Sequence, residues 1–356
     1  MAYKIVYIED QDASSVIHDL SPCDLDVAHC HPGTFKETIT EVDSHKPDLI
    51  LMDFRLTQGG SEVNAPAIAQ YYRSLAIDDS NSCLPIVLLS NDSKIRGYYD
   101  DFTSHDLFDF FIIKEYLSDK KEKYSLLIKE LIASYKCIST SQIENQDLVD
   151  LLLIPDKLEI DIDPRIKETL RSKQYQSNVY LASSFILNKI VKPVGVLIGE
   201  DVLSARLGVS KTSNDWGALC KTLKNYEYTG LYSGSYQRWW AYGIEVWWKE
   251  IIEESNHLRR FDSEGKLKIL QEKFPTLQLQ KVVGDPTTKT ENFWTICQRN
   301  FLPIDPGEAF EIQSDLTLMP WLDTKYYSYE SIRDYDLIKE LTDIERARYK
   351  EMAKRS

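Results

Sequence analysis

Short apolar runs alternate with segments of helical periodicity over residues 1–135. The runs are rich in Ile, Val, Leu and Phe without intervening polar positions, which is typical of strands buried on both faces of a parallel sheet. The five predicted strands are Lys4–Ile8, Leu25–His29, Asp48–Met52, Pro85–Ser90 and Asp109–Ile113. The helical segments are Ala13–Leu20, Thr34–Ser44, Ala65–Leu75, Lys94–Phe102 and Lys120–Tyr135. This alternation predicts an α/β fold with a doubly wound, five-stranded parallel sheet.

The chain beyond Cys137 has a different pattern. Residues Cys137–Pro164 are polar and then acidic, and we expect them to form a linker with one short helix. Helical periodicity returns over Tyr175–Ile190, Glu264–Phe274, Thr290–Cys297 and Tyr329–Lys354. All seven tryptophans lie beyond residue 215. We therefore predict a first domain over 1–136, a linker over 137–164 and a mainly α-helical, Trp-rich second domain over 165–356.

The composition is that of an ordinary globular protein, with 43% apolar and 28% charged residues. No apolar run reaches the roughly eighteen residues of a membrane-spanning helix, and MAYKIVYIED lacks the basic and apolar regions of a signal peptide. The six cysteines are scattered without a CxxC pair, as expected of free thiols in a reducing compartment. A cytoplasmic protein without membrane attachment is therefore expected.

The predicted strands end at polar residues that can do chemistry. Glu9 and Asp10 follow the first strand and Asp53 follows the third, while Ser90 ends the fourth and Lys114 follows the fifth. The carboxyl ends of the strands in a doubly wound sheet converge on one rim, so these side chains should face a common cleft. Each residue alone has an ordinary explanation as a turn, a cap or a solvated strand end. Those explanations do not account for the joint placement.

Three carboxylates in one cleft repel one another, and a divalent cation would relieve that repulsion. Hard oxygen ligands suit Mg²⁺, which keeps several waters and accepts phosphate oxygens. Lys114 offers a positive charge to an incoming phosphoryl group, and Ser90 offers a hydroxyl to one of its oxygens. Asp53 can then act as a nucleophile and form an aspartyl phosphate.

With these residues in this order, residues 1 to about 136 resemble a response-regulator receiver domain, which has the flavodoxin-like fold. The resemblance implies that Glu9, Asp10 and Asp53 hold Mg²⁺, with the backbone carbonyl of Arg55 completing the metal site. It further implies a cytoplasmic two-component signalling protein that takes part in a phosphorelay. A sensor histidine kinase or a phosphotransfer protein would be its partner.

The same resemblance assigns roles in the switch. Asp53 would be the phosphoacceptor, and Lys114 would grip the phosphate. Ser90 and Phe111 would be the hydroxyl and the aromatic residue that rearrange on phosphorylation. No enzymatic activity is expected apart from self-phosphotransfer and autodephosphorylation at the aspartate.

Two departures from the receiver pattern bear on activity. The lysine is usually followed by a proline, and Glu115 takes that place, so the cis peptide bond of the family is not expected here. The segment between Asp53 and Ser90 is longer than usual, with Ala76–Cys83 as the predicted insertion. A pseudo-receiver that keeps the fold without being phosphorylated, and serves as a scaffold, is therefore an alternative.

The second domain contains a segment with the rhythm of a helix-turn-helix, Glu200–Leu223. It lies within Arg165–Lys249, a segment that contains 12 basic and 6 acidic residues, although the whole chain has a net charge of −14. A DNA-binding output would use Lys211, Lys221 and Lys224. The alternative is a helical hairpin packed around five apolar residues, and it is favoured because the second helix carries little positive charge. Those residues are Leu203, Leu207, Val209, Trp216 and Leu219.

Four tryptophans form the other conspicuous pattern of this domain. Trp239, Trp240, Trp247 and Trp248 are spaced as if on one helical face, with Arg238 beside them. Aromatic and arginine clusters are enriched at interface hot spots, so a downstream protein partner or a homodimer would be bound here. The alternative is a tryptophan-built core with a cation–π contact from Arg238.

An enzymatic output has the least support. His257 is the only histidine beyond residue 105, and the chain has no Walker or GxGxxG loop. Asp305 and Glu308 in PIDPGEAF are explained by helix-entrance capping. The sequence therefore favours a response regulator that relays the state of Asp53 to a protein-interaction output, with DNA binding as the second possibility. It names no stimulus, kinase or oligomeric state.

Overall fold

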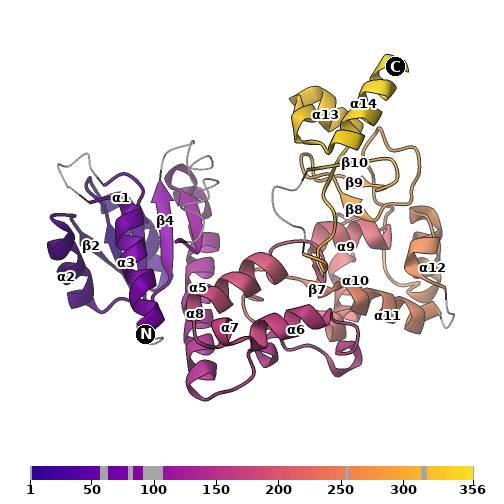
Figure 1. Cartoon of the computed structure of the whole chain (residues 1–356). Helices are drawn as coiled ribbons and strands as arrows, with labels where there is room; N and C mark the ends of the chain where they lie inside the picture. Colours follow the sequence, from indigo (N-terminus) through magenta and orange to yellow (C-terminus); the bar gives the residue numbers. More distant parts are fainter. Residues whose placement is uncertain are drawn as a thin grey trace. The chain divides into compact units, whose positions relative to one another are not determined.

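The computed structural model describes residues 2–56, 63–78, 83–90, 107–252, 256–313 and 319–355. Figure 1 shows the chain coloured along its sequence. The chain divides into two compact units. The first unit is Met1–Leu152, Pro164–Leu187 and Gly230–Ser235, and the second is Leu153–Asp163, Asn188–Thr229 and Tyr236–Ser356. No helix of the described residues is long and apolar enough to cross a membrane.

The first unit contains a five-stranded, all-parallel sheet, as predicted. Its strands are β1 (Tyr3–Ile8), β2 (Leu25–Cys30), β3 (Leu49–Asp53), β4 (Ile86–Ser90) and β5 (Phe110–Ile113). The strand order is β2-β1-β3-β4-β5, the doubly wound order of the flavodoxin-like fold. The order reverses between β1 and β3, so the carboxyl ends of these two central strands form the switch point where ligands bind in such sheets.

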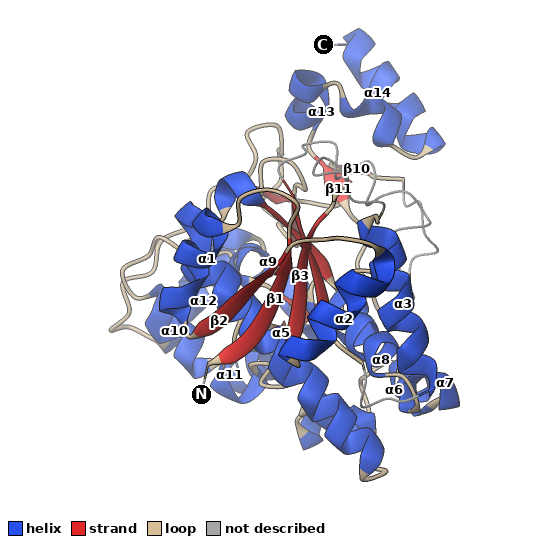
Figure 2. Cartoon of the chain, turned by 90° about the vertical axis from the view of Figure 1, so that its left-hand side faces the viewer, coloured by secondary structure: helices blue, strands red, loops and turns tan. Residues whose placement is uncertain are grey.

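Helices cover both faces of this sheet. They are α1 (Ser14–Leu20), α2 (Phe35–His45), α3 (Ala65–Asp78) and α5 (Lys121–Ile143). Figure 2 shows α1 on one face and α2 and α3 on the other. The apolar side chains of β1, β3 and β4 pack against Ile39, Val42, Ile68 and Tyr72 of α2 and α3. Burial on both faces explains why these strands are continuous apolar runs. The helix predicted over Lys94–Phe102 lies outside the described residues.

The helix predicted to end at Tyr135 continues to Ile143. Tyr135 and Ile138 are both buried, because the apolar face of α5 extends beyond the point where the sequence turns polar. Two short 3₁₀ helices, Leu148–Leu152 and Asp156–Leu158, follow. The first unit also includes α6 (Pro164–Arg171), α7 (Lys173–Gln176) and α8 (Val179–Phe185), with α8 packed against α5 and α3. The predicted domain bounds at 136 and 165 stay a prediction.

The second unit is rich in short helices joined by long loops. Its helices are α9 (Glu200–Leu207), α10 (Trp216–Thr222), α11 (Ala241–Ile252), α12 (Ser263–Lys273), α13 (Tyr329–Tyr335) and α14 (Asp343–Arg355). Its strand pairs are β6 (Leu197–Ile198) with β7 (Trp239–Trp240), β8 (Thr295–Ile296) with β9 (Pro303–Ile304), and β10 (Phe310–Glu311) with β11 (Tyr326–Tyr327). The helix predicted over Thr290–Cys297 is wrong, since that segment contains β8. The single helix predicted over Tyr329–Lys354 is two helices, because Asp336 adopts a left-handed conformation (φ 53°) that ends α13.

Alanine substitution at two glycines of the second unit is expected to change the free energy of unfolding in opposite directions. Gly208 ends α9 with φ +71°, and a Cβ there would lie 2.8 Å from Ser263 Cα. Gly208→Ala should therefore lower the free energy of unfolding by more than about 1 kcal/mol. Gly217 lies inside α10, and a Cβ there meets nothing within 4 Å among the described residues. Gly217→Ala should raise the free energy of unfolding by up to about 1 kcal/mol. Urea denaturation followed by tryptophan fluorescence measures both, and equal effects would contradict the prediction.

Candidate functional site

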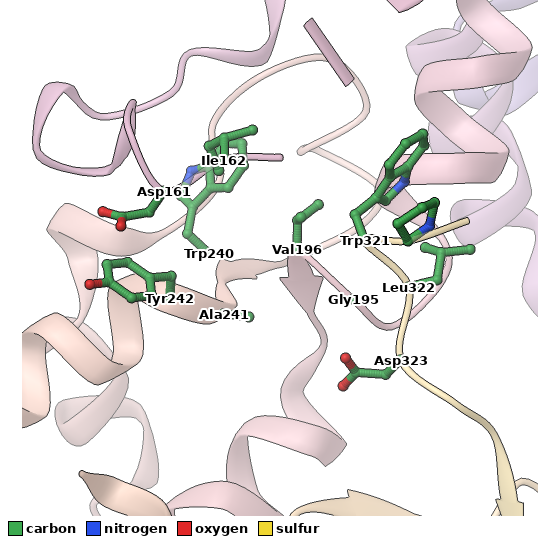
Figure 3. Close-up of a pocket in the computed structure, with 11 residues that line it drawn as sticks. Asp161, Ile162, Gly195, Val196, Trp240, Ala241, Tyr242, Trp321, Leu322 and Asp323 are labelled. Carbon is green, nitrogen blue, oxygen red and sulfur yellow. The ribbon is translucent and has the colours of Figure 1, made fainter. Parts of the chain in front are cut away.

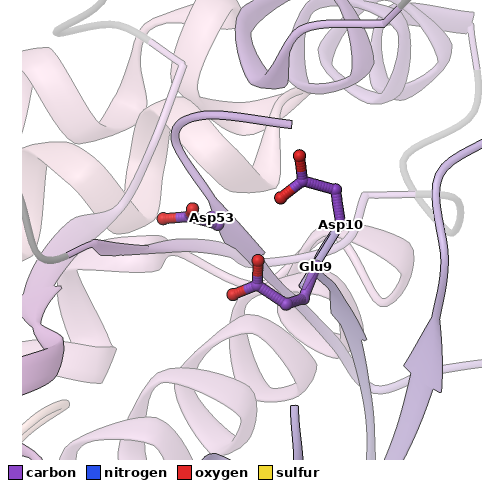
Figure 4. A group of neighbouring side chains, drawn as sticks. All are labelled: Glu9, Asp10 and Asp53. Atoms are coloured by element: carbon purple, nitrogen blue, oxygen red, sulfur yellow. The ribbon is translucent and has the colours of Figure 1, made fainter. Parts of the chain in front are cut away.

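The strand register brings the predicted polar residues to one rim of the sheet. Ile8 pairs with Met52 and Ser90 pairs with Ile113, so Glu9 follows β1 level with Asp53, and Lys114 follows β5 level with the end of β4. Figure 4 shows the side chains of Glu9, Asp10 and Asp53 gathered at this rim. The sheet topology therefore assembles the site that the sequence pattern predicts.

The three carboxylates form a cluster suited to a hard cation. One carboxylate oxygen from each of Glu9, Asp10 and Asp53 lies within 4.8 Å of the others. Glu9 and Asp10 are buried, and the Asp53 side chain is 14% exposed. Oδ1 of Asp53 is buried and accepts no hydrogen bond from any residue in the described part of the chain. An all-oxygen set with such an oxygen fits Mg²⁺, which takes oxygen ligands and retains waters.

Lys114 lies between two of these carboxylates. Its ammonium donates a hydrogen bond to Oε2 of Glu9 and lies 3.7 Å from Oδ1 of Asp53. Its side chain is 18% exposed, so the ion pairs are shielded from solvent. The lysine is therefore within reach of any group attached to Asp53 while its charge is balanced by Glu9.

Burial and neighbouring charges separate the pKa values of the two acids. Burial raises the pKa of Asp53 to about 6. The positive charge of Lys114 lowers this pKa, and the Glu9 carboxylate raises it. Hydrogen bonds from the Phe54 N–H and the Ser90 hydroxyl lower it. Burial also disfavours ionised Glu9, but hydrogen bonds from Lys114 and Tyr7 outweigh it, and the pKa of Glu9 lies below its ordinary value. Ionised Asp53 therefore depends on positive charge nearby, which Lys114 and a metal would supply.

The remaining predicted site residues lie at or near the rim. The Ser90 hydroxyl interacts with the Asp53 carboxylate. Phe111 is partly buried on β5 and packs against the sheet core. Arg55 lies two residues beyond Asp53, and the metal-binding role of its carbonyl stays a prediction. Among the described peptide bonds none is cis, including Lys114–Glu115, as expected without the proline. Residues 79–82 of the predicted insertion Ala76–Cys83 lie outside the described part of the chain.

A buried polar network at the opposite end of the sheet was not predicted from the sequence. Arg73 of α3 donates to Oδ2 of Asp109 (3.0 Å) and to the carbonyl oxygens of Leu107 and Leu84. The Tyr135 hydroxyl donates to Oδ1 of the same aspartate (2.6 Å). The Arg73 guanidinium also lies 3.7 Å from the ring centre of Tyr180 on α8. The network thus joins α3, α5 and α8 to the residue that precedes β5.

The four tryptophans predicted on one helical face do not lie on one helix. Trp239 and Trp240 form β7, whereas Trp247 and Trp248 lie on α11, because the chain passes from strand to helix at Ala241. All four are at most 4% exposed. The core interpretation is therefore the one that the structure shows, and the hypothesis of an interface at these side chains is wrong.

Arg238 beside them also has a structural role. It donates to the carbonyl oxygens of Val191 and Lys192, and its guanidinium lies 5.5 Å from the ring centre of Tyr236. The cation–π contact therefore involves this tyrosine.

The helix-turn-helix-like segment forms two short helices with buried apolar side chains, as the alternative to DNA binding predicted. Its helices α9 and α10 are separated by the eight residues 208–215, compared with the 3–4 residues of a helix-turn-helix. The five apolar residues predicted for the hairpin are all buried. Lys211 pairs with Asp201, while Lys221 and Lys224 are exposed. The helix entrance predicted at Asp305 and Glu308 is wrong, because these residues lie in a turn between β9 and β10. Both acids have a structural role there, since they accept hydrogen bonds from the Thr290 hydroxyl and from the 289–290 backbone.

The second unit contains a cavity of about 200 Å³. Figure 3 shows Asp161, Trp240 and Tyr242 on one side of Val196, with Trp321 and Asp323 on the other. Its volume is below the several hundred Å³ typical of small-molecule sites. The cavity contains none of the acids predicted for phosphoryl transfer.

Strand order, register and the polar residues on one rim give residues 3–114 the fold and the residue arrangement that the resemblance to a receiver domain predicts. Solved structures similar to the N-terminal part of the chain are response-regulator receiver domains. NtrX from Brucella abortus matches 48% of this chain at 17% identity and a TM-score of 0.32. The match spans 34% of the NtrX chain, so this chain covers about a third of that chain's length.

Two smaller proteins are matched over most of their length. A CheY-like receiver domain from Methylobacillus flagellatus matches 32% of this chain and 87% of its own, at 16% identity and a TM-score of 0.25. The chemotaxis response regulator CheY4 of Vibrio cholerae matches 32% and 88%, at 14% identity and a TM-score of 0.25. No protein-family model matches the sequence, and no curated protein matches it.

Proposed function

We propose that the protein is a two-component response regulator that accepts a phosphoryl group on Asp53. The observation that carries the proposal is the joint placement of an acid cluster, Lys114 and Ser90 at the switch point of a doubly wound sheet. A sensor histidine kinase or a phosphotransfer protein is the proposed donor.

The chain's own residues account for the transfer. An oxygen of Asp53 bonds to phosphorus as the phosphorus–nitrogen bond of the donor phosphohistidine breaks, and the leaving imidazole takes up a proton. Lys114, 3.7 Å from Asp53 Oδ1, neutralises charge that develops on the phosphoryl oxygens. Mg²⁺ held by Glu9, Asp10 and Asp53 would supply further positive charge there.

The proposed output is interaction with a protein partner. The buried network provides a route for the signal, since Asp109 lies on the chain directly before β5, which leads to Phe111 and Lys114. Arg73 connects Asp109 to Tyr180 on α8, and the chain continues from α8 into the second unit. A DNA-binding output has less support, because eight residues separate α9 from α10 and Lys211 is already paired with Asp201.

The proposal is tested by intact mass after incubation with acetyl phosphate. The wild-type protein should gain the mass of one phosphoryl group with Mg²⁺ and none with a chelator, because charge on the phosphoryl oxygens must be neutralised. Asp53→Ala is the matched control and should gain nothing in either condition. A gain in Asp53→Ala would place the reaction elsewhere. No gain in the wild type, with acetyl phosphate or with phosphorylated kinases, would identify a pseudo-receiver scaffold.

A further inference from the structure

Tyr7 is a buried tyrosine on β1, an interior strand of the sheet. It lies two residues before Glu9, so both side chains point to the same side of the chain. Its side chain is 0% exposed, and its hydroxyl donates to Oε2 of Glu9 at 2.5 Å. The Lys114 ammonium lies 5.7 Å from the centre of its ring. Tyr7 therefore contacts both members of the principal ion pair of the acid site.

Glu9 depends on three donors because it is almost completely buried. Lys114 and Tyr7 both donate to Oε2, and the Gln11 N–H donates to Oε1 at 3.1 Å. A buried carboxylate that loses its donors carries a large desolvation cost. Any movement of Lys114 away from Glu9 therefore has to leave the other donors in place.

Lys114 has two alternative partners. It bonds to Glu9 and lies 3.7 Å from Asp53, so a phosphoryl group on Asp53 would compete with Glu9 for the same ammonium. When the lysine moves, the Tyr7 hydroxyl and the Gln11 N–H remain bonded to Glu9.

We propose that Tyr7 is a positioning residue of the acid site, which holds the Glu9 carboxylate in place for the cation while Lys114 exchanges between Glu9 and Asp53. The proposal rests on the proposed function and adds a residue to it. A phenylalanine would pack in the same space, so packing alone does not require the hydroxyl.

The chain provides a matched control for this hydroxyl. Tyr72 on α3 is also buried in the first unit, and its hydroxyl also donates to a carboxylate, Oδ1 of Asp43, at 2.9 Å. Asp43 is not a member of the acid cluster. Tyr72→Phe thus removes a similar hydrogen bond from the same unit without touching the site.

The test is calorimetric titration of the full chain with MgCl₂ and no phosphodonor. Tyr7→Phe should weaken Mg²⁺ binding by about tenfold, the effect typical of losing a group that orients a metal ligand, and Tyr72→Phe should leave it within about twofold. Tyr7→Phe should have no further effect when Glu9 is already changed to Gln. A role in packing alone would instead weaken binding equally in both backgrounds.

The outcomes separate the two proposals. If the wild type binds Mg²⁺ and Tyr7→Phe binds it equally well, the positioning role of Tyr7 is wrong while the proposed function stands. If the wild type binds no Mg²⁺, both are wrong. Unfolding curves recorded with chelator check that Tyr7→Phe and Tyr72→Phe are both folded. If Tyr7→Phe is not, Glu9→Gln replaces it, and unchanged Mg²⁺ affinity in Glu9→Gln would overturn the proposal.

Discussion

Arg73→Ala is expected to lower the free energy of unfolding of the first unit by about 3–5 kcal/mol, the usual cost of removing one partner from a buried ion pair. The Arg73 and Asp109 side chains are 7% and 1% exposed. Removing the guanidinium leaves Asp109 with hydrogen bonds from Tyr135 and the Ile86 N–H and without a positive partner. The carbonyl oxygens of Leu107 and Leu84 also lose their side-chain donor.

Hydrogen exchange of peptides from β4, β5 and α5, recorded with increasing urea, measures this effect. All seven tryptophans lie in the second unit, so their fluorescence does not report on the first. Lys136→Ala is the control, because Lys136 pairs with Asp48 at 2.6 Å but is 58% exposed. An exposed pair contributes at most about 1 kcal/mol. Similar costs for the two variants would show that the Arg73 pair is effectively solvated.

The Arg73→Ala variant also tests how α8 is held against the rest of the first unit. The Arg73 guanidinium lies over the ring of Tyr180, and a cation–π contact of this kind contributes about 1–2 kcal/mol when it is shielded from water. Exchange in α8 should therefore increase along with exchange in β5. If α8 were unaffected, the route proposed between β5 and the second unit would not pass through Arg73.

The sheet and its rim were predictable from the sequence because both depend on local signals. Continuous apolar runs reveal strands that are buried on both faces, and a polar residue at the end of each run shows where the rim lies. The register of β1 with β3 then brings Glu9 and Asp53 together with no further information. The helix over Thr34–Ser44 was predictable for the same reason, since Thr34 and Glu37 form a capping box at its start.

Contacts between distant residues carried no such signal. Arg73 and Asp109 are 36 positions apart, and each reads as an ordinary charged residue beside an apolar segment. Tyr7 reads as an apolar strand position, and only its three-dimensional contact with Glu9 reveals a role for its hydroxyl. An acid two residues away on the same face of a strand is the one signal that could have indicated it.

The second unit was harder because its elements are short. Strands of two residues, such as Trp239–Trp240, have no periodicity to detect, and the helical spacing of the tryptophans was a coincidence of a strand followed by a helix. Their burial follows from the large apolar area of an indole ring, which is more stable in a core than in water. The unit thus uses aromatic packing in place of long regular elements.

Lys266→Met is expected to stabilise the second unit by about 3 kcal/mol at pH 7, which is the free energy equivalent of lowering a pKa by roughly 2.5 units. Lys266 lies on α12 and is 1% exposed. Burial lowers the pKa of Lys266 to about 8. The negative charges of Asp262 and Glu245 raise this pKa, and the positive charges of Arg206 and Arg259 lower it further. Its ammonium lies 5.9 Å from the ring centre of Trp294, a partner that it shares with both arginines.

The pH dependence of this gain tests its cause. Below pH 8 the lysine is protonated in both the folded and the unfolded chain, so the folded protein bears the full cost of the buried charge. Between pH 8 and the ordinary lysine pKa of about 10.4, the unfolded chain binds more protons, and the stability of the wild type rises with pH. The advantage of Lys266→Met should therefore shrink over that interval. Urea midpoints from tryptophan fluorescence at pH 7, 9 and 10.5 measure it.

Lys268→Met on the exposed face of the same helix is the control, and its effect should stay within about 0.5 kcal/mol at every pH. A gain for Lys266→Met that is constant with pH would mean that methionine packs better and that the buried charge carries no cost. A loss of stability at pH 7 would mean that the ammonium interacts with Trp294 and the surrounding acids more strongly than burial opposes it. In that case Lys266, Arg206 and Arg259 around Trp294 would together stabilise the core of the second unit.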